Sequence, residues 1–541
     1  MTARKLLAAG LALAALGVNV PARGGQATRT ICVGGPGCFP TLQSGIDAAR
    51  PGDTVSVRPG VYAGGITILK DVTVVGAGAR TTVIKGGGPV VIIYDVDQSR
   101  DLHVTLRGLT ITGGRNFGDR TWTEARNDVQ APWGVGGGGI LVDEANQKAT
   151  RTWVSLIDCV VTRNISRPTQ VKSAKDPFTA SDGGGIESTG RLTLIRTTIS
   201  DNVTGGGITR RALGGGIFTA AGYGHPSLTI RDSRIVGNSA IVSNRLGPDH
   251  VEGGGIEGQD GLELSISNSV ISGNRVVLDT REPPHAANEN GYWATAAGLQ
   301  VGGFGAATIV STQIADNLVK VFDPVGEPNL GDALLVGGPK EKLVIRDVTV
   351  AGNRVEATVA SVTPGPPACC PGGIVEIDSA GDVRGLRIVH NTQILRARRR
   401  LAMMGGTLWS VNAESRPLVI ADSVISGNVV IAINPDGAAW AFGGGIANDG
   451  LMIVWRTRVS GNVVRANGRS GWARGGGVWN DVLPGNGPPR LTLDPGTVVT
   501  GNVLRGGLGQ KLTGGGVFTR RPVTIRGARI RRNVPNDCHG C

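Results

Sequence analysis

The chain has 541 residues, a formal net charge of +13 and only 4% aromatic residues. A chain of this length is usually too long to fold around one compact hydrophobic core, yet no linker or shift in composition divides it into domains. A solenoid resolves this difficulty because it grows by stacking repeated units. After the N-terminus there is no apolar run of about 20 residues, and no nucleic-acid-binding module accompanies the modest positive charge. We therefore expect no membrane span and no nucleic-acid partner.

The N-terminus has the pattern of a secretory signal peptide. Arg4 and Lys5 precede an apolar stretch from Leu6 to Leu16, and small residues follow at 20–22 and 25–27. The stretch is too short to cross a membrane as a helix. We predict a signal peptide over residues 1–27, cleaved near residue 22 or 27. The mature protein is then secreted or held on the extracellular side of the cell surface.

An N-terminal cap and irregular first coils are expected over residues 28–116. Residues 41–49 carry apolar side chains at helical spacing and end before Pro51 and Gly52, which predicts a short capping helix. From Asp53 to Ile111 apolar residues alternate at irregular spacing, which predicts short strands. Such a helix would cover strand edges that a solenoid otherwise leaves open.

We predict a regular array of about eleven coils over residues 117–533. Eleven asparagines lie 31 to 43 residues apart, each three residues after a β-branched aliphatic residue, from Val161 to Ile530. A period in this range is typical of a solenoid whose single units cannot bury their apolar faces alone. The asparagines are Asn164, Asn202, Asn238, Asn274, Asn317, Asn353, Asn391, Asn428, Asn462, Asn502 and Asn533.

Each asparagine is preceded by a glycine-rich signature, clearest at 253–255 followed by Ile256, with degenerate copies near Leu299, Leu335, Ile374 and Leu408. Apolar residues alternate between signature and asparagine, which predicts short strands that pair in parallel between coils about 4.8 Å apart. An inward asparagine at a bend can bond its amide to the asparagine of the next coil. We therefore predict a structural asparagine ladder, with no catalytic role. A phosphate-binding glycine loop is excluded because neither a lysine nor a helix follows.

Seven cysteines in an exported chain favour disulfides over free thiols. We predict that Cys32 bonds to Cys38, and that Cys538 bonds to Cys541 in a C-terminal tail of residues 534–541. The tail could alternatively bind a metal through its two cysteines and His539, but structural zinc sites usually need four ligands, so no metal site is predicted. Cys159 occupies a position where other repeats carry serine or threonine, and it is interpreted as a small buried residue.

Three segments near the N-terminus read Gly-Asp-Thr-Val at 52–55, Arg-Pro-Gly-Val-Tyr at 58–62 and Val-Gly-Ala-Gly at 75–78. They resemble the first coils of pectin-lyase-like right-handed parallel β-helices. This resemblance covers nearly the whole mature chain. The paired Gly-Gly-Gly-Ile and Ile-x-x-Asn signatures also resemble the repeats of polymorphic outer-membrane proteins, which are surface adhesins. The resemblance implies an all-β fold, a single-stranded right-handed parallel β-helix. Catalytic motifs of family-28 polygalacturonases, pectate lyases and alginate epimerases are absent, which lowers the expectation of an enzyme.

If the aliphatic residue that ends each signature points inward, the next residue points outward. The predicted exposed row is Leu141, Glu187, Phe218, Glu257, Gln300, Val336, Val375, Trp409, Ala447, Trp479 and Phe518. Trp409, Trp479 and Phe518 are candidates for a platform on which sugar rings stack. The alternative is that these rings cover neighbouring glycines or pack beneath loops.

Glu187 and Glu257 are candidate catalytic residues. They belong to coils two apart, so their backbones should lie about 9.5 Å apart, within the range of about 6.5–9.5 Å that separates the carboxyl groups of inverting glycosidases. Each has an acidic neighbour across its glycines, Asp182 and Glu252. The alternatives are that these acids are merely solvated, or that they bridge a cation without a dedicated motif.

A long loop over residues 275–295 supplies a second candidate set. It carries Arg281, His285 and Tyr292 beside the predicted acidic row. In this hypothesis His285 and Tyr292 act on a glycan while Arg281 neutralises a uronate. Clustering of these side chains with the glutamates would favour catalysis, and dispersal around the coil would count against it.

Two functional hypotheses follow. The first is a noncatalytic exported β-helix with a glycan-binding or adhesin-like role. The second is an extracellular polysaccharide lyase or glycoside hydrolase. Both imply an extracellular polysaccharide or cell-surface glycan as partner, a monomer and no cofactor. A dense cation cluster at Arg396, Arg398, Arg399 and Arg400 is interpreted as a solvated loop, with a polyanion site as the alternative.

Overall fold

The computed structural model describes residues 28–95, 101–117, 134–144, 152–169, 179–220, 226–243, 250–259, 261–281, 293–303, 305–326, 328–337, 342–360, 372–399, 401–411, 416–482 and 489–541. The predicted signal peptide at 1–27 lies outside these ranges, as do His285, Tyr292 and Arg400.

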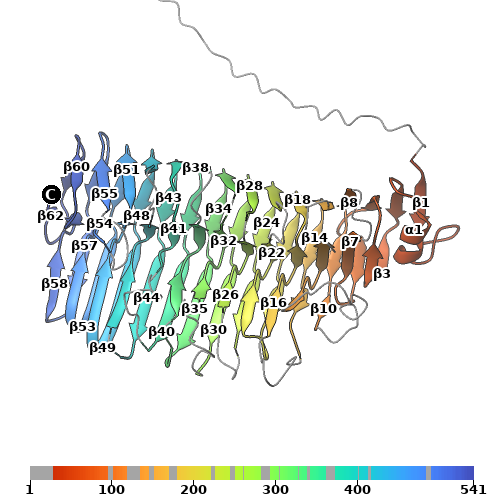
Figure 1. Ribbon diagram of the computed structural model, residues 1–541, viewed down its shortest axis with the longest axis horizontal. Coiled ribbons are helices and arrows are strands. Elements are labelled where there is room, and N and C mark those ends of the chain that lie inside the picture. The colour runs from red at the N-terminus through yellow and green to blue at the C-terminus, as the bar shows by residue number, and fades with distance from the viewer. Residues whose placement is uncertain are drawn as a thin grey trace, which may run out of the picture.

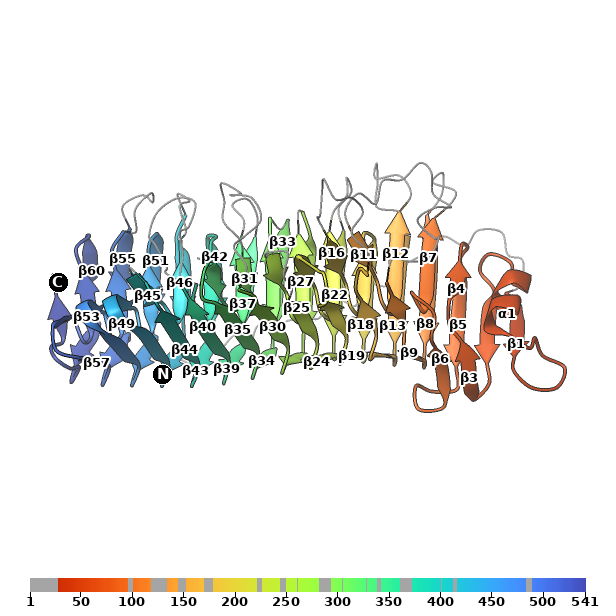
Figure 2. The ribbon, with the colours of Figure 1, turned by 90° about the horizontal axis from the view of Figure 1, so that it is seen from below.

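The chain winds into coils that stack along one axis, from α1 at the red end to β62 at the blue end of Figure 1. One coil shows the pattern through five strands: β27 (Ile256–Gln259), β28 (Glu263–Ser267), β29 (Val270–Ser272), β30 (Arg275–Asp279) and β31 (Trp293–Thr295). Each strand pairs in parallel with its counterparts in the coils before and after, as Ile256 pairs with Ile217 and Leu299. The fold is a parallel β-helix, as the sequence predicts, and Figure 2 shows the strands of successive coils side by side.

The strands form five sheets, which the chain visits in the order C, A, B, D and E. Sheet A has fifteen strands, from β1 (Thr30–Val33) to β60 (Val523–Ile525), and sheet B has fourteen, from β3 (Gly60–Ala63) to β61 (Arg529–Arg531). Sheet C also has fourteen, from β4 (Ile66–Ile68) to β62 (Cys538–His539). Sheet D has thirteen strands, with its main path from β10 (Arg115–Asn116) to β57 (Val503–Gly506), and sheet E has six, from β11 (Gly134–Gly136) to β36 (Asn329–Gly331).

Sheet E is continued toward the C-terminus by the second halves of long strands in sheet D. These strands are β49 (Val429–Phe442) and β53 (Val463–Arg474), and the short strands β45 (Leu401–Gly405) and β58 (Gln510–Thr513) pair with them. We refer to these second halves as the sheet E extension. The described coils from β11 to β36 and from β45 to β58 therefore have a wall beside sheet C.

The β-branched residues that precede the asparagines form one row in sheet B. From Val161 to Ile530 they pair in register from coil to coil. From Val161 to Val499 they are fully buried, and only Ile530 in the last coil is partly exposed. Branched side chains have few rotamers and pack well on a pleated surface, which suits this narrow interior.

The helix α1 (Leu42–Ala48) covers the first coil. The Thr41 hydroxyl accepts a hydrogen bond from the Ser44 N–H at 3.1 Å, and the Ser44 hydroxyl accepts one from the Thr41 N–H at 3.3 Å. This reciprocal capping fixes the start of the helix. Leu42 and Ile46 are buried at 1% exposure, so the predicted capping helix is confirmed. Within the described residues, no helix has the length and apolarity needed to cross a membrane.

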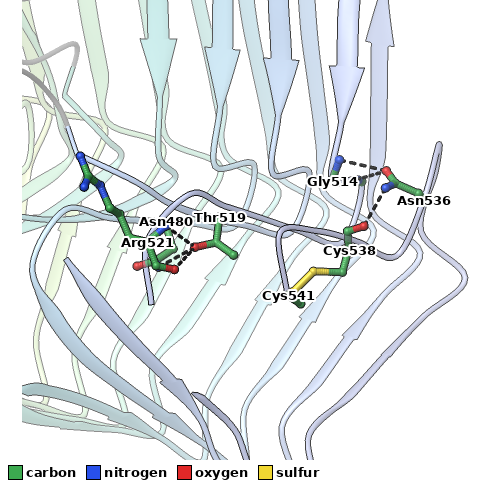
Figure 3. Close-up of a disulfide and its surroundings, with 8 residues drawn as sticks. Asn480, Gly514, Thr519, Arg521, Asn536, Cys538 and Cys541 are labelled. Atoms are coloured by element: carbon green, nitrogen blue, oxygen red, sulfur yellow. Dashed lines mark hydrogen bonds between the residues drawn. A yellow bond between two sulfur atoms is a disulfide. The ribbon is translucent and has the colours of Figure 1, made fainter. Parts of the chain in front are cut away.

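Both predicted cysteine pairs are bonded, Cys32 to Cys38 and Cys538 to Cys541. Figure 3 shows the second disulfide beside Asn536, whose amide donates to the Cys538 carbonyl at 2.7 Å and accepts from the Gly514 N–H at 2.9 Å. The tail thereby folds back onto the last coil. Cys159 is a free buried thiol, and burial raises its pKa to about 11.

Candidate functional site

The chain turns tightly between sheet E and sheet C, where the glycine signatures lie. Gly253 has φ of 61°, in the left-handed region that favours glycine. A Cβ on Gly254 would overlap the backbone carbonyl groups of Arg275 and Ala297. Because no side chains occupy the turn, the outward side chains of sheets E and C meet on either side of it. We call this region the E–C corner and define it by those outward side chains, including those of the sheet E extension.

The outward row of sheet C differs from the predicted row at two positions. The register gives Leu141, Glu187, Phe218, Glu257, Gln300, Leu335, Glu376, Trp409, Ala447, Trp479 and Phe518. Val336 and Val375 were predicted in this row, but both point inward and are fully buried. The error arises because the glycine signature is degenerate in these two coils, so the register could not be inferred from it.

The predicted exposure of this row is also wrong. Glu257, Trp409 and Ala447 are 0% exposed, and no other member is fully open to solvent. The reason is the wall formed by sheet E and its extension, which packs against sheet C across the glycine turn. Alternation of apolar residues identifies the outward face of a strand, but it cannot reveal that a distant segment covers that face.

The predicted sugar platform lies within this packing. Phe442, from the sheet E extension, has its ring centroid 5.7 Å from Trp409 and 4.5 Å from Trp479. The Arg474 guanidinium lies 4.7 Å from the ring centroid of Phe518. Trp479 and Phe518 are 2% and 1% exposed, so these rings offer no open surface for a sugar. They instead pack beside the signature glycines, which is the alternative considered from the sequence.

Three carboxyl groups gather at the N-terminal half of the corner, and we call them the Glu257 cluster. Asp182 ends β16 (Ala180–Asp182), Glu252 ends β26 (His250–Glu252), and Glu257 lies on β27. Register confirms that Glu187 and Glu257 belong to coils two apart, and Asp182 and Glu252 are likewise two coils apart.

Hydrogen bonds join the two walls of the corner at this cluster. The Gln300 amide of sheet C donates to Glu252 at 2.9 Å, and the Thr295 hydroxyl donates to Gln300 at 2.8 Å. The Gln259 amide donates to Glu257 Oε1 at 3.3 Å, whereas Glu257 Oε2 has no hydrogen-bond partner among the described residues. A fully buried oxygen without a partner is costly.

The two acids at the ends of this cluster titrate differently. Burial, reinforced by the Glu252 charge, raises the pKa of Glu257 well above its usual range. Burial raises the pKa of Asp182 to about 6, and the Arg211 guanidinium opposes that rise. Glu257 therefore holds its proton more tightly than an ordinary glutamate does, and Asp182 holds its proton more tightly than an ordinary aspartate. Two neighbouring carboxyl groups whose surroundings shift their pKa values by different amounts can act as a general acid and a general base.

Glu187 is not the partner of Glu257. Its side chain leans over Gly136 in the preceding coil, where a Cβ would overlap Glu187 Oε2. The charges that affect the pKa of Glu257 are those of Glu252, Arg211 and Asp182. The predicted spacing of two coils between Glu187 and Glu257 is correct, but the acid whose charge affects Glu257 from two coils away is Asp182.

Only Arg281 of the second candidate set lies within the described residues. Arg281 follows β30 of sheet D, and its guanidinium lies 5.4 Å from the ring centroid of Phe322 on β35 (Leu318–Asp323) of the same sheet. His285 and Tyr292 lie outside the described residues. Arg281 thus contacts an aromatic ring on sheet D, away from Glu257.

Sequence reasoning missed a second acidic group, Asp332, Glu376 and Asp378, which we call the Glu376 cluster. Glu376 lies on β41 (Val375–Ile377), Asp378 follows on the same face, and Asp332 occupies the turn with φ of 72°. Burial, reinforced by the Asp378 charge, raises the pKa of Glu376 and of Asp332 well above their usual ranges. Burial raises the pKa of Asp378 to about 6. The cluster was missed because the register of this strand was misassigned. The spacing of Glu376 and Asp378, two residues apart, by itself places both side chains on one face of a strand.

Neither cluster has the arrangement of a metal centre. Among the described residues, no group of three or more His, Cys, Asp or Glu side chains is placed to hold a metal ion. Besides its carboxyl groups, the Glu257 cluster includes Arg211 and His250, whose Nδ1 lies 3.6 Å from Glu252 Oε1.

Comparisons with known proteins identify structural likeness only. No family model and no curated protein sequence matches the chain. Among solved structures, a pectin methylesterase point mutant bound to a hexasaccharide is 12% identical, with a TM-score of 0.26 over 54% of this chain and 81% of its own. Pectin methylesterase PemA from Erwinia chrysanthemi is 11% identical, with a TM-score of 0.26 over 55% of this chain and 81% of its own. At these values the likeness extends no further than the fold.

Proposed function

We propose that the protein is an exported glycoside hydrolase that cleaves a polysaccharide laid along the E–C corner. Glu257 acts as the general acid and Asp182 as the general base. The observation that carries this proposal is the Glu257 cluster, in which burial raises the pKa of Glu257 well above its usual range and that of Asp182 to about 6. Burying such groups is unfavourable for stability, and strongly shifted carboxyls concentrate at functional sites.

In the proposed reaction a water molecule lies between the substrate and the base. Asp182 is on sheet E and Glu257 on sheet C, two coils apart along the axis, so the stacking distance of about 9.6 Å is a minimum for the separation of their backbones, and both side chains point into the corner between the two sheets. Inverting glycosidases separate their two carboxyl groups by about 6.5–9.5 Å. The acid protonates the departing glycosidic oxygen, and the base takes a proton from the attacking water. Arg211, on the coil between them, stabilises the ionised form of Asp182.

Access to Glu257 involves the amides beside it. Glu257 is 0% exposed, and Gln259 donates a hydrogen bond to it. A bound sugar must reach the Glu257 carboxyl beside the Gln259 amide and offer its glycosidic oxygen to Oε2. The unpartnered Oε2 is the oxygen that can carry the transferred proton without losing an existing hydrogen bond.

The test is hydrolysis of a panel of neutral and acidic polysaccharides by the mature protein, followed by reducing-end release. Glu257→Gln and Asp182→Asn should each lower turnover by about a hundredfold or more, since each removes one proton-transfer group. The matched control is Glu263→Gln, an exposed carboxyl on sheet A of the same coil as Glu257, which should retain wild-type turnover. Turnover that survives Glu257→Gln would remove the assignment.

A second candidate function is noncatalytic glycan binding, and the complete burial of Glu257 favours it. Its contact surface would be the wall of the corner, where Trp440 and Trp472 are half-buried on β49 and β53 with ring centroids 5.3 Å apart. Retention of the protein on an insoluble glycan without any product, together with loss of retention in Trp472→Ala, would support this function over hydrolysis.

A further inference from the structure

The positive charge of the protein is concentrated at one end. Residues 451–541, which we call the C-terminal sector, contain 14 lysines and arginines but only 3 aspartates and no glutamate. Residues 1–450 hold the remaining 41 cationic and 39 acidic side chains, since the whole chain has 55 and 42. The sector therefore carries +11 of the total +13. It begins at β51 (Leu451–Trp455) and forms the last coils of the β-helix.

These cations are available for a partner. All of them are exposed except Arg474, which is partly buried beside Trp472. Asp481 pairs with Arg520 and Arg521, and Asp494 pairs with Arg526. Arg456 and Arg469 pair with aspartates of the preceding coil. Among the described residues, the other nine cations of the sector have no carboxylate within 4.0 Å.

The arrangement places like charges next to each other. Arg465 and Arg505 are direct neighbours in sheet D, and both are exposed. Like charges at opposed positions destabilise a sheet. Cations can protect the open edge of a terminal strand, which accounts for Arg529 and Arg531 on β61. Edge protection does not account for Arg465, because β53 is paired on both sides.

We propose that the C-terminal sector binds an acidic polysaccharide, one whose sugars carry carboxylate groups. Its arginines can bind carboxylates through two parallel N–H donors. The cations lie on several faces of the last coils, including Arg458 on sheet B and Arg505 on sheet D. A flat lipid surface would contact only one of these faces, whereas a flexible polyanion can follow the cations around the coil. This site is separate from the E–C corner and does not depend on catalysis.

The experiment measures binding of the full mature protein to polygalacturonate over a series of salt concentrations. Wild-type protein should bind, with an affinity that falls as salt rises because exposed charges are screened. Arg465→Glu with Arg505→Glu should weaken binding by about tenfold or more. The matched control, Arg234→Glu with Arg275→Glu, reverses two exposed arginines on sheets B and D of earlier coils and should leave binding unchanged.

Further variants keep the result interpretable. If charge reversal impairs folding, Arg465→Gln with Arg505→Gln removes the same contacts without adding repulsion and should reduce the salt dependence. Glu257→Gln should bind polygalacturonate as the wild type does, so a failure of the hydrolase proposal leaves this one standing. No binding, equal weakening by the control pair, or tighter binding to duplex DNA or to anionic lipid vesicles would overturn the proposal.

Discussion

Asn274 illustrates how single residues hold the stack together. Its side-chain amide donates to Asn317 Oδ1 at 3.0 Å and to the Ile235 carbonyl at 2.9 Å. Its own Oδ1 accepts from the backbone and side-chain N–H groups of Asn238, both at 3.0 Å. The same pattern runs from Asn164 to Asn533, where Asp537 accepts the last bonds. Each asparagine thereby satisfies polar groups that the bend would otherwise leave buried and unpaired.

Replacing Asn274 with alanine should destabilise the protein by about 2–5 kcal/mol, because it leaves the Asn238 N–H groups and the Ile235 carbonyl unpaired in the interior. Urea denaturation measures the change. The control Gln313→Ala removes an exposed amide from the adjacent coil and should change stability by less than about 0.5 kcal/mol. Equal effects of the two substitutions would show that the ladder bonds contribute little.

The sequence predicts this ladder well because its members recur at a fixed offset from an aliphatic residue. It does not predict a second, shorter ladder in sheet C, where Asn448 donates to Asn480 Oδ1 at 2.8 Å and Asn480 donates to the Thr519 hydroxyl at 2.9 Å. That ladder has too few members to appear as a repeat. Glu376 was missed for a related reason, since its coil keeps only two signature glycines, Gly372 and Gly373, and the register inferred from them was wrong by one residue.

At the scale of elements, the glycine turn determines what the corner can contain. Strands and the capping helix follow from local alternation and capping residues, so they could be predicted. The wall formed by sheet E could not, because its position against sheet C depends on a chain reversal between sheets D and E that has no local pattern. Consequently Trp409 and Glu257 were correctly placed on the outward face and incorrectly expected to be exposed.

Gly254→Ala should destabilise the protein by about 1–3 kcal/mol, since the added Cβ overlaps two backbone carbonyl groups that cannot move without disturbing their coils. Thermal unfolding followed by circular dichroism measures this effect. Gly302→Ala on β32 (Leu299–Gly302) is the matched control, because no atom lies within 4 Å of the added Cβ. A melting temperature lowered equally by both would contradict steric crowding at the turn.

For the whole molecule, the buried carboxyls set the dependence of stability on pH. The pKa values of Asp182 and Asp378 are raised from 3.8 to about 6, so the folded state binds their protons more tightly than the unfolded state. Their protonated forms favour folding, and that contribution is lost as pH rises from about 4 through 6. Backbone hydrogen bonds and Arg29 lower the pKa of Asp53 to about 2, so its contribution is lost only as pH falls below 3.8 toward 2.

Stability should therefore be highest near pH 4 to 5 and should decline toward pH 8, by no more than about 3 kcal/mol for each group shifted to about 6. Denaturation at a series of pH values measures the slope. Asp182→Asn combined with Asp378→Asn should flatten the decline, because neither amide can ionise. A profile that rises from pH 5 to pH 8 would contradict the assigned direction of these shifts.

The most direct test of the account is the protonation state of Glu257 at neutral pH. Infrared spectra of the wild type and of Glu257→Gln, recorded in D₂O at pH 7, isolate this group in their difference. We expect a protonated carboxyl band that is present in the wild type and absent from the variant. A difference spectrum that instead shows the loss of an ionised carboxylate would contradict it, because Glu257 could then not serve as the acid of the corner.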